Sequence, residues 1–274
     1  MNDADAARRA AVAARAAADA GDLAAGYVDA AVETKSTPTD FVTDADHAAQ
    51  DRVLAALGEA FPGEPVVGEE EGTDPRLREA VPETGPAWVV DPIDGTTNYV
   101  RGLPTWGCAV ACVVDRDPVA AAVVEPELGR RYVGDAAAAR LDGTVAETSD
   151  LTDPREATVV PFYWWGHDER DAYSAGVDAA LRRFDDVQRL GCAQASLASV
   201  ADGGLAGVFT DRRVASWDSV AGVHLVRLAG GRVTDLDGER WTVGAAGLVA
   251  SNGSPAVHEA LTECATAARA AAGD

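Results

Sequence analysis

Small and apolar residues follow helical spacing at the start of the chain. Residues 4–31 are rich in alanine with arginine and aspartate interspersed, a composition that favours a closely packed helix. A second helix is expected to begin at Thr43 and to end at 61–63. Its apolar stripe consists of Ala49, Val53, Leu54, Leu57 and Phe61. Short apolar runs at 66–68 and 87–90 predict buried strands, the second of them ending at 91–92.

The next segments alternate between strand-forming and turn-forming residues. Two β-rich runs between Cys108 and Val124 flank the turn-forming residues 115–118, which predicts a hairpin. Residues 131–133 are expected to add a strand, and the Asp-Gly pair at 142–143 predicts another tight turn. We therefore expect residues 1–150 to form an α+β lobe with a largely antiparallel sheet and most of the metal ligands.

Strand and helix alternate after residue 150, which is the order of an α/β lobe. The expected strands are 158–160, 186–187, 207–209, 233–236 and 248–250. The expected helices lie near 168–183, near 193–202, from about Ser216, and after the cap formed by Ser254 and Pro255. We see no internal repeat and no linker. Residues 151–274 are thus expected to pack as a second lobe that supplies Asp218 and substrate contacts.

Charge and composition narrow the functional classes. The 274 residues carry 23 basic and 45 acidic side chains, a formal net charge of −22. This balance argues against a nucleic-acid binder, because phosphate backbones are bound mainly by clustered Lys and Arg. No run approaches the roughly 18 apolar residues of a membrane span, and the start is acidic where a secretory signal would be basic, so we expect a cytoplasmic protein with no membrane contact.

Two further features of the composition carry expectations. Lys35 is the only lysine in an acidic, alanine-rich chain, which suggests a halophilic protein from a high-salt cytoplasm, where screening relieves carboxylate repulsion. The four cysteines make no close pair and are expected to be buried free thiols: Cys108, Cys112, Cys192 and Cys264.

The segment 91–98, Asp-Pro-Ile-Asp-Gly-Thr-Thr-Asn, is the strongest candidate for chemistry. A buried strand delivers Asp91 at its end, and Asp94 returns three residues later in a tight turn where both carboxylates can converge. Gly95 permits close backbone approach, and the amides of a helix starting here would receive an anion. Two carboxylates aimed at one point repel unless a cation lies between them, and hard oxygen ligands favour Mg²⁺. A turn that both acids merely cap is the alternative.

Two more acids could complete such a site. Glu69 follows the strand expected at 66–68, and Asp218 stands where an apolar helix begins. Each has a simple alternative: a solvated acidic face for Glu69, and a helix N-terminal charge for Asp218. Only in combination with Asp91 and Asp94 do they predict a metal site.

Taken in order, these segments resemble the signatures of the inositol monophosphatase family. The matching segments are 35–46, 68–70, 91–98, 217–222 and 230–235. The similarity spans nearly the whole chain, and ordered motifs of this kind are highly specific. The resemblance implies an αβαβα sandwich of the sugar phosphatase type, made of two closely packed lobes. It also implies a Mg²⁺-dependent phosphomonoesterase, often a homodimer, with its metal site between the lobes.

Carried over position by position, the resemblance implies a set of ligands. Glu69, Asp91 and the carbonyl of Ile93 would hold one ion, while Asp91, Asp94 and Asp218 would hold another. A third, looser ion would lie near Glu69, which gives two or three Mg²⁺ ions in all.

The resemblance also assigns catalytic roles. Thr96 with Asp46 would orient and deprotonate the attacking water, so that Asp46, Glu69 and Thr96 are the candidate catalytic residues. The amides of Gly95 and Thr96 would receive the phosphate. Asp46 also has a structural interpretation, because Thr43 and Asp46 form the Thr-x-x-Asp pattern of a helix cap.

The resemblance leaves the substrate open. The candidate substrate-binding residues are Lys35, Asp94, Gly95, Thr96, Gly191, Cys192, Ala193 and Asp211. Asp211 replaces the Glu that more often bonds substrate hydroxyls in the family, and Cys192 stands where Ser or Thr is usual. An ordinary loop cation at Lys35 and simple helix packing at 191–193 are the alternatives.

We expect a small sugar or polyol phosphate as substrate, with inositol 1-phosphate first. Fructose 1,6-bisphosphate and histidinol phosphate are the rivals, because the family shares its metal core and the recognition residues lie outside that core. Residues 101–106 and 128–132 also resemble the histidinol-phosphatase branch. A non-catalytic acidic cation-binding protein is the alternative of a different class. The aromatic run at 162–165 has no counterpart in the family pattern, and core packing, a dimer contact or a substrate wall are its interpretations.

Overall fold

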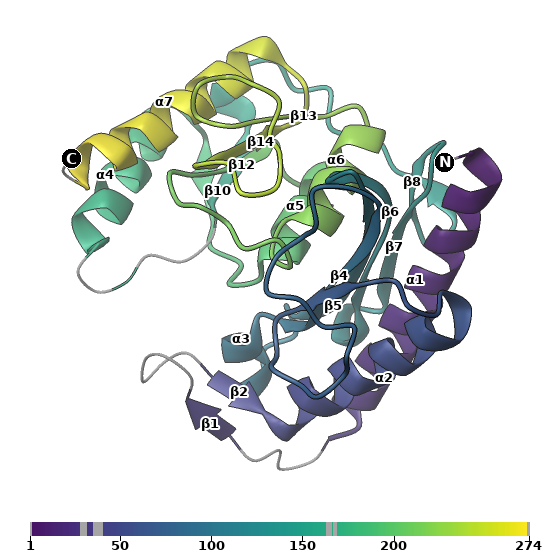
Figure 1. The fold of residues 1–274 in the computed structure, drawn as a ribbon. Helices are drawn as coiled ribbons and strands as arrows, with labels where there is room; N and C mark the ends of the chain where they lie inside the picture. The colour runs from purple at the N-terminus through teal and green to yellow at the C-terminus, as the bar shows by residue number, and fades with distance from the viewer. Residues whose placement is uncertain (1, 28–31, 35–40, 163–165, 167–168, 273–274) are drawn as a thin grey trace.

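Helices and sheets alternate in five layers in the part of the chain that the structure, a computed structural model, describes: residues 2–27, 32–34, 41–162, 166 and 169–272. The helices are α1 (Asp3–Ala25), α2 (Asp44–Ala60), α3 (Thr96–Val100), α4 (Arg170–Leu181), α5 (Ala193–Ala201), α6 (Val220–Leu228) and α7 (Pro255–Ala271). In Figure 1, α1 and α2 cover one sheet, α5 and α6 lie between the two sheets, and α4 and α7 cover the other. This arrangement confirms the predicted αβαβα sandwich.

The larger sheet has seven strands in the order β3-β4-β5-β6-β7-β8-β9. Their bounds are β3 (Val66–Gly68), β4 (Pro86–Asp94), β5 (Gly107–Val114), β6 (Asp117–Glu125), β7 (Arg130–Gly134), β8 (Ala139–Leu141) and β9 (Thr144–Val145). Among the described residues only β3 and β4 pair in parallel within it, so the sheet is largely antiparallel, as expected. The predicted hairpin turn between β5 and β6 is present, with Asp115 and Arg116 at φ 52° and 68°.

The smaller sheet has five strands in the order β11-β10-β12-β14-β13. Their bounds are β10 (Thr158–Pro161), β11 (Asp186–Val187), β12 (Gly207–Thr210), β13 (Arg232–Thr234) and β14 (Leu248–Ser251). β10, β11 and β12 are parallel, because helices α4 and α5 connect them, whereas β13 and β14 are antiparallel neighbours. A separate hairpin pairs β1 (Val32–Thr34) with β2 (Phe41–Thr43).

Three groups of buried side chains hold the layers together. Alanines of α1 and the predicted stripe of α2 pack on the larger sheet, where Ala49, Val53 and Leu57 are fully buried. The central helices α5 and α6 are buried between both sheets. The third group joins α4 and α7 to the smaller sheet. The small side chains of α1 allow the close packing that its composition predicted.

Two element ends differ from the sequence expectation. α1 stops at Ala25 and does not continue to residue 31, since the amide of Gly26 closes its last turn on the carbonyls of Asp22 and Leu23. α6 begins at Val220, because residues 216–219 form a turn ahead of it.

The predicted stop of a strand at 91–92 is also wrong, because β4 continues through Pro92 to Asp94. Its register against β5 shifts between Asp91 and Asp94, and an irregular ladder tolerates a proline that lacks a donor. Ser254 lies at the predicted cap position of α7, but its side chain makes no capping hydrogen bond.

The remaining expectations concern the cysteines, membrane spans, the aromatic run and the division into lobes. All four cysteines are buried and free. No helix in the described ranges has the length and apolar character needed to cross a membrane. Phe162 is buried, while the rest of the aromatic run, 163–165, lies outside the described residues. The division into lobes at residue 150 stays a prediction.

Candidate metal centre

Strand β4 delivers two acids to the middle of the molecule. Asp91 and Asp94 are only 1% and 5% exposed, although both are carboxylates. The segment 88–90 that precedes them is completely apolar and buried between β3 and β5, which fixes the strand in place. The register shift after Asp91 then lets the chain turn at Gly95, whose φ of 84° is a conformation that favours glycine.

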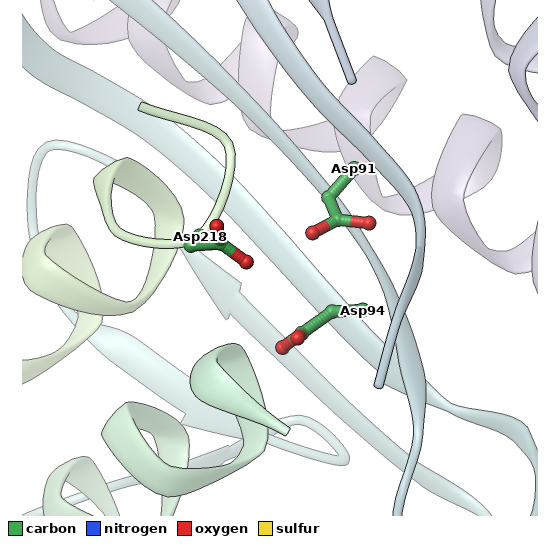
Figure 2. Close-up of side chains that lie close together, drawn as sticks. All are labelled: Asp91, Asp94 and Asp218. Atoms are coloured by element: carbon green, nitrogen blue, oxygen red, sulfur yellow. The ribbon is translucent and has the colours of Figure 1, made fainter. Parts of the chain in front are cut away.

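Three acids from two distant segments converge. One carboxylate oxygen each of Asp91, Asp94 and Asp218 lies within 4.8 Å of the others. Figure 2 shows the three side chains pointing toward one another, with Asp218 approaching from the loop that precedes α6. The structure therefore brings together three of the predicted ligands.

The electrostatics of Asp91 fit a bound cation. Neither of its buried oxygens has a hydrogen-bond partner among the described residues. Burial raises the pKa of Asp91 well above its ordinary value, and the nearby charges of Glu69, Asp94 and Asp218 raise it further. A buried carboxylate without donors among other carboxylates is costly unless a positive charge compensates it. Oxygen ligands of this kind suit a hard divalent cation such as Mg²⁺.

Glu69 borders this cluster at the end of β3. Its amide donates to the carbonyl of Val90 at 3.2 Å, which ties the residue to the strand that carries Asp91. Its charge is the largest single electrostatic cause, after burial, of the raised pKa of Asp91. The predicted place of Glu69 beside Asp91 is thus consistent with the geometry, and its role as a ligand stays a prediction.

Asp94 serves a second structural purpose at the start of α5. Its oxygens accept hydrogen bonds from the Cys192 thiol at 2.9 Å, from the amide of Ala193 at 3.0 Å and from the amide of Gln194. Burial raises the pKa of Asp94 to about 6, while these three donors act in the opposite direction. The carboxylate therefore caps α5 and faces the acid cluster at the same time.

Asp46 combines the two roles that its sequence pattern left open. Its Oδ2 accepts from the amide of Thr43 at 2.8 Å and from the Thr43 hydroxyl at 2.6 Å, which completes a capping box at α2. Its Oδ1 faces Thr96, whose hydroxyl oxygen is 3.4 Å away. The Thr96 hydroxyl also lies 3.0 Å from the carbonyl of Ile93. One oxygen of Asp46 thus holds the helix, and the other lies beside the predicted catalytic hydroxyl.

The structure gives the surroundings of some of the predicted substrate-binding residues. Cys192 and Ala193 contact Asp94 directly, and Gly191 precedes them with a φ of 75°. Asp211 is half-buried directly after β12, and its contact with substrate stays a prediction. Lys35 lies outside the described residues.

Two buried amides that build the site, Asn98 and Gln194, were not among the residues expected from the sequence. Asn98 donates through Nδ2 to the carbonyls of Thr105 and Leu190, at 2.7 and 2.8 Å, and so anchors the chain before Gly191. The side chain of Gln194 bonds to Trp217 in the loop that carries Asp218 and to Gly222 in the first turn of α6. Asn98 lies within the recognised motif and could have been noticed there, whereas nothing in the local pattern marks Gln194.

Known proteins are similar to this chain in sequence and in fold. A model of the inositol monophosphatase family matches residues 5–272. The chain is 34% identical over 239 residues to a histidinol-phosphatase of Mycobacterium tuberculosis, covering 83% of this chain and 86% of the relative. It is also 34% identical over 239 residues to an inositol-1-monophosphatase of Mycobacterium leprae, covering 84% and 80%.

A solved structure agrees with the sequence relatives. An IMPase from Thermotoga maritima superimposes with a TM-score of 0.83 at 25% identity, covering 94% of this chain and 97% of that one. The sequence match over nearly the whole chain, the shared layers and the converging acids lead to one conclusion. The chain belongs to the inositol monophosphatase family.

Proposed function

We propose that this protein hydrolyses a small sugar or polyol phosphate, inositol 1-phosphate first among them, with Mg²⁺ as its cofactor. The observation that carries the proposal is Asp91, a buried carboxylate without hydrogen-bond partners among the described residues, facing Asp94 and Asp218. Family membership confirms the predicted enzyme class, a phosphoric monoester hydrolase. The substrate, the identity and number of the ions and the residue roles are the parts we propose.

The acids of the cluster would hold two or three Mg²⁺ ions. Asp91, Asp94 and Asp218 would share one ion, and Glu69, Asp91 and the carbonyl of Ile93 another. When bound, such ions neutralise the charge that grows on phosphate oxygens during transfer. This explains how a chain with a net charge of −22 can bind a dianion, because the local charge at the site differs from the overall charge.

The chain's own proton acceptor would be the pair Asp46 and Thr96. The Thr96 hydroxyl lies within 3.4 Å of Asp46 Oδ1, so a water bound by the hydroxyl oxygen can pass its proton toward that carboxylate. The capping bonds to Thr43 hold Asp46 in this orientation. A rigidly held base loses little freedom when the substrate binds.

The substrate would lie against the segment that Asp94 organises. The amides of Gly95 and Thr96 would receive the phosphate, and Gly191, Cys192, Ala193, Asp211 and Lys35 would contact the remainder of the molecule. The two relatives at 34% identity are named for different substrates, so inositol 1-phosphate and histidinol phosphate are both candidates, with fructose 1,6-bisphosphate as a third. A homodimer, a cytoplasmic location and adaptation to high salt stay predictions.

Phosphate release from these three esters tests the proposal. The protein is assayed at high salt with Mg²⁺ and again with EDTA, and inorganic phosphate is measured. We expect release that requires Mg²⁺ and is fastest with inositol 1-phosphate. Faster release from histidinol phosphate would overturn the substrate assignment, and Mg²⁺ binding without release from any ester would indicate the non-catalytic cation-binding alternative.

A further inference from the structure

Gln194 connects the two segments that carry Asp94 and Asp218. It is the second residue of α5 and is fully buried. Its backbone amide donates to Asp94 Oδ2. Its side chain reaches the other segment, where Nε2 donates to the carbonyl of Trp217 and Oε1 accepts from the amide of Gly222 at 2.7 Å.

The side chain of Gln194 takes the place of a helix cap on α6. The first amides of a helix have no partner within it and normally bond to a side chain at the N-cap. The N-cap of α6 is Ser219, whose side chain makes no capping bond and donates to the carbonyl of Ala215 at 2.7 Å. The amide of Gly222, in the first turn of α6, is satisfied from a neighbouring helix by Gln194.

The two side-chain bonds of Gln194 lie on either side of Asp218. Trp217 precedes the acid and Gly222 follows it by four residues, so the loop is held before and after Asp218. Gly222 permits the close packing of α6 on α5 that brings its amide to Gln194, because a Cβ there would clash with Leu197 Cβ and lie 3.0 Å from Gln194 Oε1. The same residue therefore bonds to Asp94 through its backbone and fixes the approach of Asp218 through its side chain.

We propose that Gln194 is a positioning residue for divalent-ion binding, which sets the place of Asp218 relative to Asp94. The inference rests on the proposed function, in which these two acids share an ion. Removing the partner that orients a metal ligand typically weakens metal affinity by 10- to 100-fold. The Asp94 side of the link survives substitution, since it uses the backbone amide, so we expect the lower end, roughly a tenfold loss.

Calorimetric titration of the full chain with MgCl₂ tests this role. We expect Gln194→Leu to raise the Kd for Mg²⁺ roughly tenfold and to shift the Mg²⁺ dependence of turnover by the same factor, with saturating Mg²⁺ restoring most of kcat. Gln194→Ala is the second variant, because its smaller side chain admits water to the freed backbone groups if the leucine variant does not fold.

Asn252→Leu is the matched control. Asn252 is also a buried amide, whose Nδ2 donates to carbonyls of Ser149 and Leu151 and whose Oδ1 accepts from the amide of Ser254. The loop to Asp218 starts after Thr210, at one end of β12. Asn252 follows Ser251, which pairs with Gly207 at the other end of β12, so it lies away from that loop. Its substitution is expected to lower the melting temperature and leave the Kd for Mg²⁺ unchanged.

The possible results are distinguishable. A folded Gln194 variant with the wild-type Kd for Mg²⁺ overturns the positioning role and leaves the proposed function standing. An equal rise in Kd for the Gln194 and Asn252 variants overturns it as well, since the effect would then be general destabilisation. A wild-type protein that binds no Mg²⁺ overturns both the inference and the proposed function.

Discussion

Replacing Asp91 by asparagine is expected to stabilise the metal-free protein while removing its ion binding. Asp91 is 1% exposed, and no described residue donates a hydrogen bond to its carboxylate. The asparagine side chain would be neutral, and its amide could donate to the neighbouring carboxylates. The substitution therefore removes a repulsion that the wild type relieves by binding a cation or by taking up a proton.

The size of the effect follows from the distances. The carboxylate oxygens lie within 4.8 Å of one another, so each pair repels by at least about 3 kcal/mol at an effective dielectric constant of about 20, and Asp91 faces two such partners. Protonation limits this cost, because keeping a proton costs a carboxyl about 1.4 kcal/mol for each pH unit above its ordinary pKa. At pH 7 the cost of keeping Asp91 protonated is roughly 4 kcal/mol, which is less than the repulsion from its two partners together. The protonation cost therefore sets the size of the expected effect. Allowing for the burial of the new amide, we expect a gain of about 2 to 4 kcal/mol.

Thermal unfolding in EDTA at pH 7 measures this gain. The variant is expected to melt roughly 4 to 8 °C above the wild type in EDTA, and to gain nothing when Mg²⁺ is added. Asp74→Asn is the control of opposite sign, because Arg76 bonds to Asp74 and lowers its pKa, so that its neutralisation loses a favourable contact. If Asp91→Asn lowered the melting temperature as Asp74→Asn does, carboxylate repulsion could not be what the site relieves by binding a cation.

Three further predictions concern Asp46, Arg9 and Asp94. Asp46→Asn is expected to lower turnover by about 100-fold or more with an unchanged melting temperature, because the amide oxygen can keep the cap; a large fall in melting temperature would contradict this. Arg9→Leu removes the buried ion-pair partner of Glu64 at 2.8 Å and should lower the free energy of unfolding, measured in urea, by about 3 kcal/mol. The double variant that also carries Glu64→Leu should recover part of this loss. The pKa of Asp94 is raised to about 6, so near this pH the folded protein binds a proton that the unfolded chain has released. The metal-free protein should therefore become more stable as the pH falls from 7 toward 5. A melting temperature that drops over this range would contradict the prediction.

Most helices and strands could be predicted because their signals are local, whereas their arrangement in five layers was implied only by the family resemblance. The stripe of α2 repeats at helical spacing, and Asp115 and Arg116 form the turn that their flanking runs predicted. The ends of elements depend on contacts that no local pattern contains. β4 continues through Pro92 because of its irregular pairing with β5, and β1 was missed because three residues become a strand only by pairing with Phe41–Thr43.

The candidate site was predictable to the extent that its residues share a short segment. Asp91 and Asp94 lie at the end of one buried strand, so their convergence follows from the motif itself. Asp218 was only one of many possible partners until the resemblance assigned it, since more than a hundred residues separate it from Asp94. The role of Gln194 could not be predicted, because glutamine is an ordinary helix former. Its importance depends on an amide at the start of the neighbouring α6 that needs a hydrogen-bond acceptor.

Crystals of the protein soaked in Mn²⁺, measured near the manganese absorption edge, test the central claim most directly. Mn²⁺ takes the same hard oxygen ligands as Mg²⁺ and can be located by its anomalous scattering. The convergence of Asp91, Asp94 and Asp218 predicts a strong anomalous peak between their carboxylates, lost in Asp91→Asn. A map with no peak there at saturating Mn²⁺ would contradict the metal centre and, with it, the proposed chemistry.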